Sequence, residues 1–401
     1  MPSDRPLNML VLACYFKGER FIKQAHARGA QVHLVTQERL KDKPWPHESL
    51  AGFFAQMNDP PLRATINTVS YLARTLPIDR LVGLDDFDVE VAASLREHLR
   101  LPGMGESTAR FFRDKLACRL GCRKLGIAVP EFTPVFNNDE VARFIERVPG
   151  PWMLKPRSEA SATGIHKVES ADDLWRLLDS KADLRSFFLL EQFLPGDVYH
   201  VDALTAGGRI LFAEAHRCLN PPFNVAHGGG IFATYTLKRG GEEEREILAV
   251  HEKALLGLGM VSGASHVEFI KSRADGRFYL LETAARVGGA HIAEQVEAST
   301  GLNLWEEWAD VELCGAERPY ALPPRRAEYA GLLMTLSRDE RPDLSCFDAP
   351  EVCFRAPEPW HAGVIVRSPS YERVLELLTE YEARLRRDFT AMLPAPTRAT
   401  H

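Results

Sequence analysis

The first quarter of the chain alternates between two hydrophobic periods. Short apolar runs of strand length are separated by segments in which apolar positions recur every three to four residues, as on one face of a helix. The strand-like runs occupy residues 8–16, 30–36 and 79–86, and the helix-like segments occupy residues 18–29 and 88–101. Strands that alternate with helices predict an open, mostly parallel α/β sheet.

The strand at 79–86 ends in a cluster of acidic residues. Open α/β sheets bind ligands at the ends of their strands, so Asp86 and Asp88 lie where a ligand is expected. Aspartate is also a preferred helix N-cap, and we favour that interpretation, in which one of the two caps the following helix. The first strand is not followed by Gly-x-Gly-x-x-Gly, so no dinucleotide site is predicted.

Beyond a turn-rich segment at 101–108, the pattern becomes a longer mixture of strands and helices. This mixture extends to about residue 315. The remaining segment, 316–401, begins Pro-rich and ends in an amphipathic helix over 370–389. We therefore predict an α/β protein with an N-terminal domain over 1–105, a central domain over 106–315 and a C-terminal α+β region.

Two glutamates near the ends of two apolar strands are the most informative feature of the central domain. Residues 265–270 and 278–282 flank a turn at Asp275-Gly276, a pattern that predicts an antiparallel hairpin. Such a hairpin brings Glu268 and Glu282 side by side. Two like charges repel unless a cation lies between them, and Mg²⁺ that itself holds phosphates is a natural solution. The alternative is an ion cluster of both glutamates with Arg286.

Composition narrows the class of protein. The 401 residues carry 49 Lys and Arg against 55 Asp and Glu, a balance that argues against a nucleic-acid scaffold. No apolar run approaches the length of a membrane span, and the N-terminus lacks the order of a signal peptide. The seven scattered cysteines form no Cys-x-x-Cys pair, which favours a reducing compartment. We expect a cytoplasmic protein that binds neither nucleic acid nor membrane.

The order of these features resembles the ATP-grasp superfamily of carboxylate–amine ligases. A lysine on a helix (Lys115), a lysine closing an apolar strand (Lys155), a small polar loop at 157–165 and the glutamate hairpin follow one another as in that superfamily. The chain is most similar to single-chain L-amino-acid ligases and more distantly to biotin carboxylase. The resemblance covers about residues 5–315. It implies an ATP-grasp fold whose small lobe spans about 130–195 and whose large lobe spans about 196–315.

The resemblance implies a set of ATP contacts. The loop at 157–165 lacks bulk and can expose backbone amides to phosphates, and the extended segment 191–194 can offer its backbone to a purine edge. The expected contacts are Lys115, Lys155, Ser158, Ser161, Gly164, Glu191, Gln192, Phe193, Leu194, Asp197 and His200. Many members of the superfamily have a ribose-binding glutamate where this chain has Val198. We therefore assign ribose contact to His200 or Asp197. The alternative makes Asp197 a turn residue and His200 a satisfied strand histidine.

Metal and catalytic roles follow from the same resemblance. It implies that Glu268 and Glu282 bind Mg²⁺, with Mn²⁺ as an alternative, and that Arg286 and Lys155 are catalytic. The usual asparagine of the family is Ala284 here, which leaves open whether one or two ions bind.

Four further residues are assigned to the substrate. Gly288 and Gly289 precede a helix start, where backbone amides favour an anion. Arg217 and His227 lie between strands of the same lobe, and the glycine-rich loop after His227 reads equally well as a plain linker. His227 and His266 are candidates for the base that accepts a proton from an amine.

The implied reaction is amide or peptide bond formation. A carboxylate, expected to belong to an amino acid, attacks ATP to give an acyl phosphate, and an amine then displaces phosphate. The expected partners are these two small molecules, and a homodimer is left open. An ATP-dependent carboxylase or phosphotransferase on the same fold is one alternative. A non-catalytic ATP-binding regulator is another, disfavoured by the two glutamates and Arg286 but kept open by Val198 and Ala284.

Overall fold

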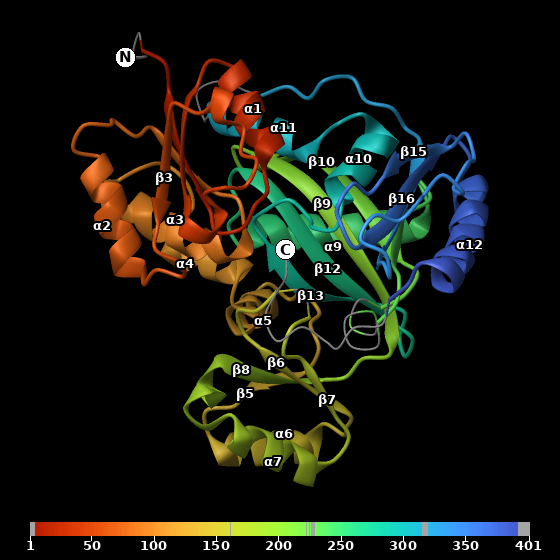
Figure 1. Cartoon of the computed structure of the whole chain (residues 1–401). Coiled ribbons are helices and arrows are strands. Elements are labelled where there is room, and N and C mark those ends of the chain that lie inside the picture. The colour runs from red at the N-terminus through yellow and green to blue at the C-terminus, as the bar shows by residue number, and fades with distance from the viewer. Residues whose placement is uncertain are drawn as a thin grey trace.

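The computed structural model describes residues 5–160, 162–221, 223, 225, 229–314 and 320–391. Its described part contains an N-terminal sheet, a small lobe and a large sheet that continues into the C-terminal region (Figure 1). Two predicted site residues, Ser161 and His227, lie outside the described residues.

The N-terminal sheet is parallel, as the alternation of strand and helix predicts. Its strands run in the order β3-β2-β1-β4. The elements are β1 (Asn8–Ala13), α1 (Glu19–Ala27), β2 (Gln31–Gln37), β3 (Gly52–Gln56), α2 (Leu62–Leu72), β4 (Arg80–Gly83) and α3 (Asp86–Leu99), with 3-10 turns at Glu38–Leu40 and His47–Ser49. Strand β3 and helix α2 had no counterpart in the sequence prediction.

The cap of α3 differs from the prediction. Asp85, and not Asp86 or Asp88, accepts a hydrogen bond from the Phe87 amide at 3.1 Å and is the N-cap. Asp88 accepts from the Cys14 amide instead, at 3.1 Å. The Asp86 side chain does not cap the helix and instead accepts from Arg286.

A helical segment leads into the small lobe. It contains α4 (Glu106–Ala109), a 3-10 turn at Arg110–Phe112 and α5 (Lys115–Lys124), whose N-cap Asp114 accepts from the Leu116 and Ala117 amides. The lobe itself comprises β5 (Phe132–Pro134), α6 (Asn138–Arg147), β6 (Trp152–Pro156), β7 (His166–Val168), α7 (Ala171–Ser180), a 3-10 helix at Ala182–Phe187 and β8 (Phe188–Gln192). The strands are antiparallel in the order β5-β8-β6-β7, and α6 and α7 lie together on one side of them (Figure 1).

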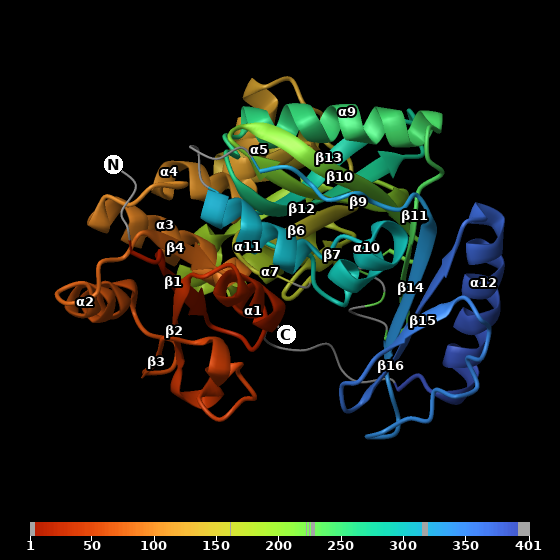
Figure 2. The ribbon, with the colours of Figure 1, turned by 90° about the horizontal axis from the view of Figure 1, so that it is seen from above.

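The large sheet forms the centre of the molecule. Its strands β9 (Gly196–Ala206), β10 (Arg209–Cys218), β11 (Phe232–Thr236), β12 (Gly263–Ser272) and β13 (Phe278–Ala284) are arranged in the order β13-β12-β9-β10-β11. Helix α9 (Glu242–Gly257) covers one face, and α10 (Ile292–Thr300) and α11 (Leu304–Cys314) lie on the other (Figure 2). Helix α11 also packs on α1, which joins this sheet to the N-terminal domain.

The C-terminal region extends the same sheet. Strand β14 (Tyr329–Leu336) pairs with β11, β16 (His361–Ser368) pairs with β14, and β15 (Val352–Arg355) closes the series. Helix α12 (Tyr371–Asp388) buries an apolar face against β14 and β16. The expected boundary near residue 315 therefore does not separate two sheets.

Candidate active site

Strands β12 and β13 pair so that Glu268 lies directly opposite Glu282. The hairpin turn thus brings the two carboxylates side by side, which is the geometry that the sequence predicts. About a third of each side chain is exposed, 32% and 29% respectively. The Nζ of Lys115, at the start of α5, lies 2.8 Å from Glu282 Oε1 and also donates to the Glu159 carbonyl. Lys115 thus contacts one of the two facing carboxylates, and His266 Nε2 lies 3.6 Å from the other, Glu268 Oε1.

A row of polar side chains continues from these carboxylates across the sheet. The register of β9 with β12 places His200 opposite Glu268 and Asp202 opposite His266. Because alternate residues of a strand share a face, all four side chains lie on the face that carries the carboxylates. Strand β10 extends the row with His216, whose ring stacks on His200 with centroids 4.7 Å apart.

Asp202 is the centre of this row. Its two oxygens accept from His200 Nδ1 at 2.6 Å and from His266 Nδ1 at 2.9 Å. The polar atoms of these three residues lie close enough together to suggest a metal site. However, both N···O distances are those of direct hydrogen bonds, so we interpret the group as a hydrogen-bonded cluster. Burial acts to raise the pKa of Asp202, but the two histidines lower it well below its usual range.

The structure does not support ribose contact by His200. The side chain is 2% exposed, and its second nitrogen, Nε2, lies 2.8 Å from Thr234 Oγ1. Both ring nitrogens therefore have partners inside the protein, as in the alternative of a satisfied strand histidine.

Asp197 and Arg217 lie on the opposite face of the sheet. Arg217 Nη2 contacts Asp197 Oδ2 at 2.7 Å, and the guanidinium lies over the Tyr199 ring in the core beneath α9. Since side chains alternate, Val198 and His200 point to the carboxylate face while Asp197 and Tyr199 point away from it. The predictions that Asp197 contacts ribose and Arg217 contacts substrate are therefore not supported by this geometry.

Glu191 has a different environment from the one expected. Its carboxylate is fully buried and lies 2.6 Å from Arg119 Nε and 2.6 Å from Lys155 Nζ. Burial acts to raise the pKa of Glu191, but the charges of Arg119 and Lys155 outweigh it and hold the pKa at about 2. The side chain is thus committed to two cations, and only the backbone of this residue remains as a purine contact. Arg119 was missed, although its place four residues after Lys115 on one helix face was a usable signal.

The hinge that follows β8 leads into an apolar patch on the carboxylate face. The amides of Gln192 and Phe193 donate to the carbonyls of Glu131 and Pro151. Leu194 packs against Val198, and both belong to a small apolar cluster that also contains Cys218, Ile270, Tyr279 and Leu281. An apolar surface next to an extended hinge matches what a purine ring requires.

The small polar loop begins beside α5. The Arg157 carbonyl accepts from the Lys115 amide at 2.8 Å, and Ser158 follows it. Gly164 closes the loop with φ +69°, and a Cβ there would meet the Pro156 ring at 3.0 Å. The structure therefore places the loop next to Lys115.

Arg286 bridges the large sheet and the N-terminal domain. Its Nε and Nη2 lie 2.7 and 2.6 Å from Asp86 Oδ2, at the start of α3. Burial acts to raise the pKa of Asp86, but Arg286 lowers it well below its usual range. The hydrogen bonds of Arg286 go to Asp86 and to the Val287 carbonyl rather than to Glu268 or Glu282.

The two glycines after β13 differ from each other. A Cβ on Gly288 would come within 2.9 Å of Asp202 Oδ1 and 3.1 Å of His266 Nδ1. Gly289 faces open space, and α10 begins three residues later. Gly288 is therefore required by the packing of the histidine cluster, whereas Gly289 lies on the accessible side.

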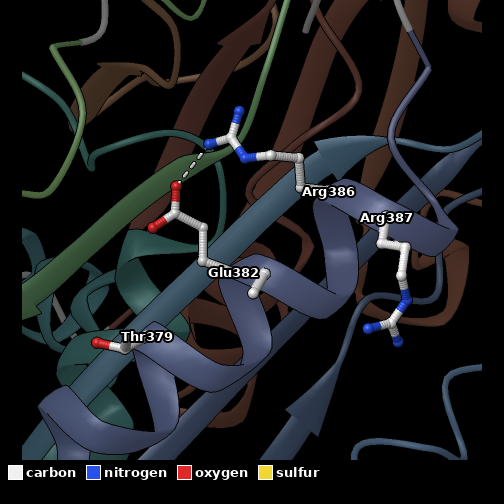
Figure 3. A pocket seen from close by; sticks show the side chains of 5 residues that line it. Thr379, Glu382, Arg386 and Arg387 are labelled. Atoms are coloured by element: carbon white, nitrogen blue, oxygen red, sulfur yellow. Dashed lines mark hydrogen bonds and ion pairs between the residues drawn. The ribbon is translucent and has the colours of Figure 1, made fainter.

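A shallow depression of about 490 Å³ lies elsewhere, on α12 (Figure 3). Thr379, Glu382, Arg386 and Arg387 line it, and Glu382 pairs with Arg386 along the helix at 2.8 Å. It contains none of the residues predicted to bind ATP, metal or substrate. We base the candidate site on the facing carboxylates.

None of the helices in the described residues is both long and apolar enough for a membrane span.

No family model matches the sequence. An L-arginine-specific L-amino acid ligase of Bacillus subtilis is 24% identical over 243 residues, which cover 59% of this chain and 58% of the relative. The match thus spans little more than half of that relative's length.

Solved structures match over almost the whole chain. An L-amino acid ligase from Bacillus licheniformis has a TM-score of 0.76 at 20% identity and covers 97% of this chain and 99% of its own. The biotin carboxylase domain of Hydrogenobacter thermophilus 2-oxoglutarate carboxylase has a TM-score of 0.72 at 16% identity, covering 97% and 91%. The predicted resemblance to both groups is confirmed. The chain has the ATP-grasp fold, and its sequence is similar to that of an amino-acid ligase.

Proposed function

We propose that this protein is an ATP-dependent ligase that joins an amino-acid carboxylate to an amine. The observation that carries the proposal is the register of β12 and β13, which sets Glu268 opposite Glu282. The similarity to an L-amino acid ligase supports the class of reaction and of substrate.

The two carboxylates fit a hard divalent cation. They face each other, remain partly exposed, and have the Lys115 ammonium at Glu282 as a nearby counter-charge. Oxygen ligands of this kind suit Mg²⁺, and Mn²⁺ is the alternative. When bound, Mg²⁺ would neutralise charge on the ATP phosphates. Ala284 offers no ligand atom where the family often has an asparagine, so we propose a single ion held by Glu268 and Glu282.

The surrounding residues would bind and orient the nucleotide. Lys115, beside the partly exposed Glu282, and Lys155, held by the buried Glu191, would direct positive charge toward the phosphates. Leu194 and Val198 would supply the apolar surface for adenine. Ser158, Gly164 and the backbone of 191–194 keep their predicted roles as ATP contacts.

The chemistry requires no protein nucleophile. The substrate carboxylate oxygen attacks the γ-phosphorus of ATP, the bond to the ADP oxygen breaks, and an acyl phosphate forms. The amine nitrogen then attacks the acyl carbon, loses a proton, and phosphate leaves with the C–O electron pair. Arg286, buried beside the hairpin and paired with Asp86, would stabilise the negative charge that develops in the second step. Gly289, on the accessible side before α10, would receive the carboxylate or its acyl phosphate.

Phosphate release from MgATP tests this proposal. Amino acids and amines would be supplied singly and in pairs, and product masses recorded. Release that requires a pair, with a product mass equal to the sum of the two minus water, is the expected result. Release with bicarbonate alone or a phosphorylated product would replace the ligase with a carboxylase or phosphotransferase. ATP binding without any release would point to a regulator.

A further inference from the structure

Arg119 contacts both the small lobe and the glutamate hairpin of the candidate site. The side chain is fully buried on α5, one helical turn after Lys115. Its Nε donates to Glu191 Oε1 at 2.6 Å, and its Nη2 donates to the Leu281 carbonyl at 2.6 Å. One guanidinium thus contacts both the small lobe, through Glu191, and the glutamate hairpin, through Leu281.

The contact at Leu281 falls on an irregularity of the hairpin. Glu268 opposes Glu282, but the next residue, Phe269, opposes Leu280, so Leu281 is an extra residue in β13. The extra residue of such a bulge is left out of the regular ladder, and the strand bends there. The Leu281 carbonyl, part-buried at this position, accepts a hydrogen bond from Arg119. Since Leu281 directly precedes Glu282, the same contact fixes the direction of the Glu282 side chain.

The contact at Glu191 acts on the other lobe. Glu191 on β8 holds Arg119 with one oxygen and Lys155 of the neighbouring strand β6 with the other. The three side chains form a short chain of ion pairs whose ends are the Leu281 carbonyl and the Lys155 ammonium. A movement of Lys155 relative to Glu282 would stretch one of these contacts.

We propose that Arg119 is a positioning residue that sets the distance between Lys155 and Glu282, and so couples nucleotide binding to metal binding. The proposal rests on the proposed function, in which those two residues hold ATP and Mg²⁺. The guanidinium suits this task because its donors diverge in a fixed plane and can reach two acceptors at once. A lysine carries one charge at one point and can keep the pair with Glu191 while it loses the bond to Leu281.

The difference between arginine and lysine provides the test. In the full chain, ATP binding would be measured by calorimetry without metal and across a Mg²⁺ series, for the wild type and for Arg119→Lys. We expect the metal-free ATP affinity to stay close to that of the wild type. The Mg²⁺ concentration needed for half of the full effect should rise by about 10-fold or more, as when groups that orient a metal ligand are removed.

A matched control separates this effect from the loss of any arginine that donates to two backbone carbonyls. Arg96 also donates to two backbone carbonyls, those of Leu81 and Met104, but it lies on α3 away from the hairpin. The Mg²⁺ dependence of Arg96→Lys should equal that of the wild type. An equal shift in both variants would overturn the proposal.

A second variant covers the case in which Arg119→Lys does not fold. Arg119→Met combined with Glu191→Gln removes one charge of each sign and leaves a side-chain amide oxygen that can still accept from Lys155 Nζ. It should still raise the Mg²⁺ requirement, because Leu281 loses its donor. A folded variant, by near-UV circular dichroism, with wild-type Mg²⁺ dependence would overturn the role of Arg119. Failure of the wild type itself to bind MgATP would instead overturn the proposed function.

Discussion

The structure contains two carboxylate environments that cannot be told apart from the sequence alone. Glu268 and Glu282 face each other at the hairpin and are about a third exposed, and Lys115 lies at hydrogen-bonding distance from Glu282. Glu191 is fully buried and lies between Lys155 and Arg119. All three glutamates occur in or near the end of an apolar strand.

The difference between the two environments is one of charge balance. The two hairpin carboxylates have Lys115 at Glu282 and His266 Nε2 at 3.6 Å from Glu268 as their basic neighbours, and both are partly open to solvent, so a cation can still bind between them. The Glu191 pair has a surplus of positive charge and no opening, so its own lysine and arginine satisfy it. The cations around each carboxylate thus distinguish a glutamate that can bind a ligand from one that stabilises the fold.

The largest effect that this comparison predicts is on turnover. Glu282→Gln should lower the rate of ADP release by on the order of 100-fold or more, because several kcal/mol of charge stabilisation at the phosphates would be lost. Thermal unfolding should show that the fold is intact. Glu246→Gln, which alters a glutamate paired with Lys271 on the far face, is the control and should keep full activity. Full activity in Glu282→Gln would remove this residue from the metal site.

For the free energy of unfolding, we expect the larger loss at Glu191 rather than at Glu282. Glu191→Gln leaves Arg119 and Lys155 buried without their anion, so the free energy of unfolding should fall by about 3–5 kcal/mol. Glu282→Gln should change it less, because Glu282 is 29% exposed and Lys115 keeps the Glu159 carbonyl as an acceptor. Urea unfolding of both variants measures the contrast. Equal losses would mean that the two environments do not differ as described.

The dependence of the unfolding free energy on pH at acid pH gives a third comparison. The folded-state pKa of Glu191 is held at about 2, below its value of about 4.3 in an unfolded chain. A depressed carboxylate pKa adds stability that is fully present above the unfolded pKa and is lost as the pH falls through the folded one. Between about pH 4.3 and 2, the unfolding free energy of the wild type should therefore fall more steeply than that of Glu191→Gln. Parallel slopes would contradict the buried ion pairs.

The smallest effect is expected on the far face of the sheet. Asp197 pairs with Arg217 and Arg273 at the surface, so Asp197→Asn should cost less than about 1 kcal/mol of stability. ATP affinity, measured by calorimetry, should stay within about twofold of the wild type. A large loss of affinity would return Asp197 to the nucleotide site and would mean that the register of β9 is different.

The sequence predicted features that depend on local spacing. The turn at Asp275-Gly276 joins two adjacent strands, so the meeting of Glu268 and Glu282 follows from a few residues of chain. The parallel N-terminal sheet followed in the same way from its alternation of periods. Strand β3 was not predicted because it is short and half-buried, without a clear apolar face.

The features that the sequence did not predict depend on distant partners. Which face of β9 meets the carboxylates is decided by its register with β12. A shift of one residue would bring Asp197 and Tyr199 to the carboxylate face and turn His200 away from it. The pair of Arg286 and Asp86 joins residues 200 positions apart. Arg119 acquires its role only because a bulge in β13 leaves the Leu281 carbonyl beside it.

The continuous sheet also determines how this protein can be divided. Strand β14 covers β11, so a chain cut near residue 315 would leave β11 as an open edge with unpaired amides and carbonyls. Such edges recruit strands from other molecules, and truncated chains aggregate through them. The same cut would also remove α12 and so expose Ile231, Ala233 and Tyr235 of the retained part, which belong to the apolar cluster that α12 now helps to bury. Work on isolated ATP-binding lobes should therefore retain the chain through Asp388.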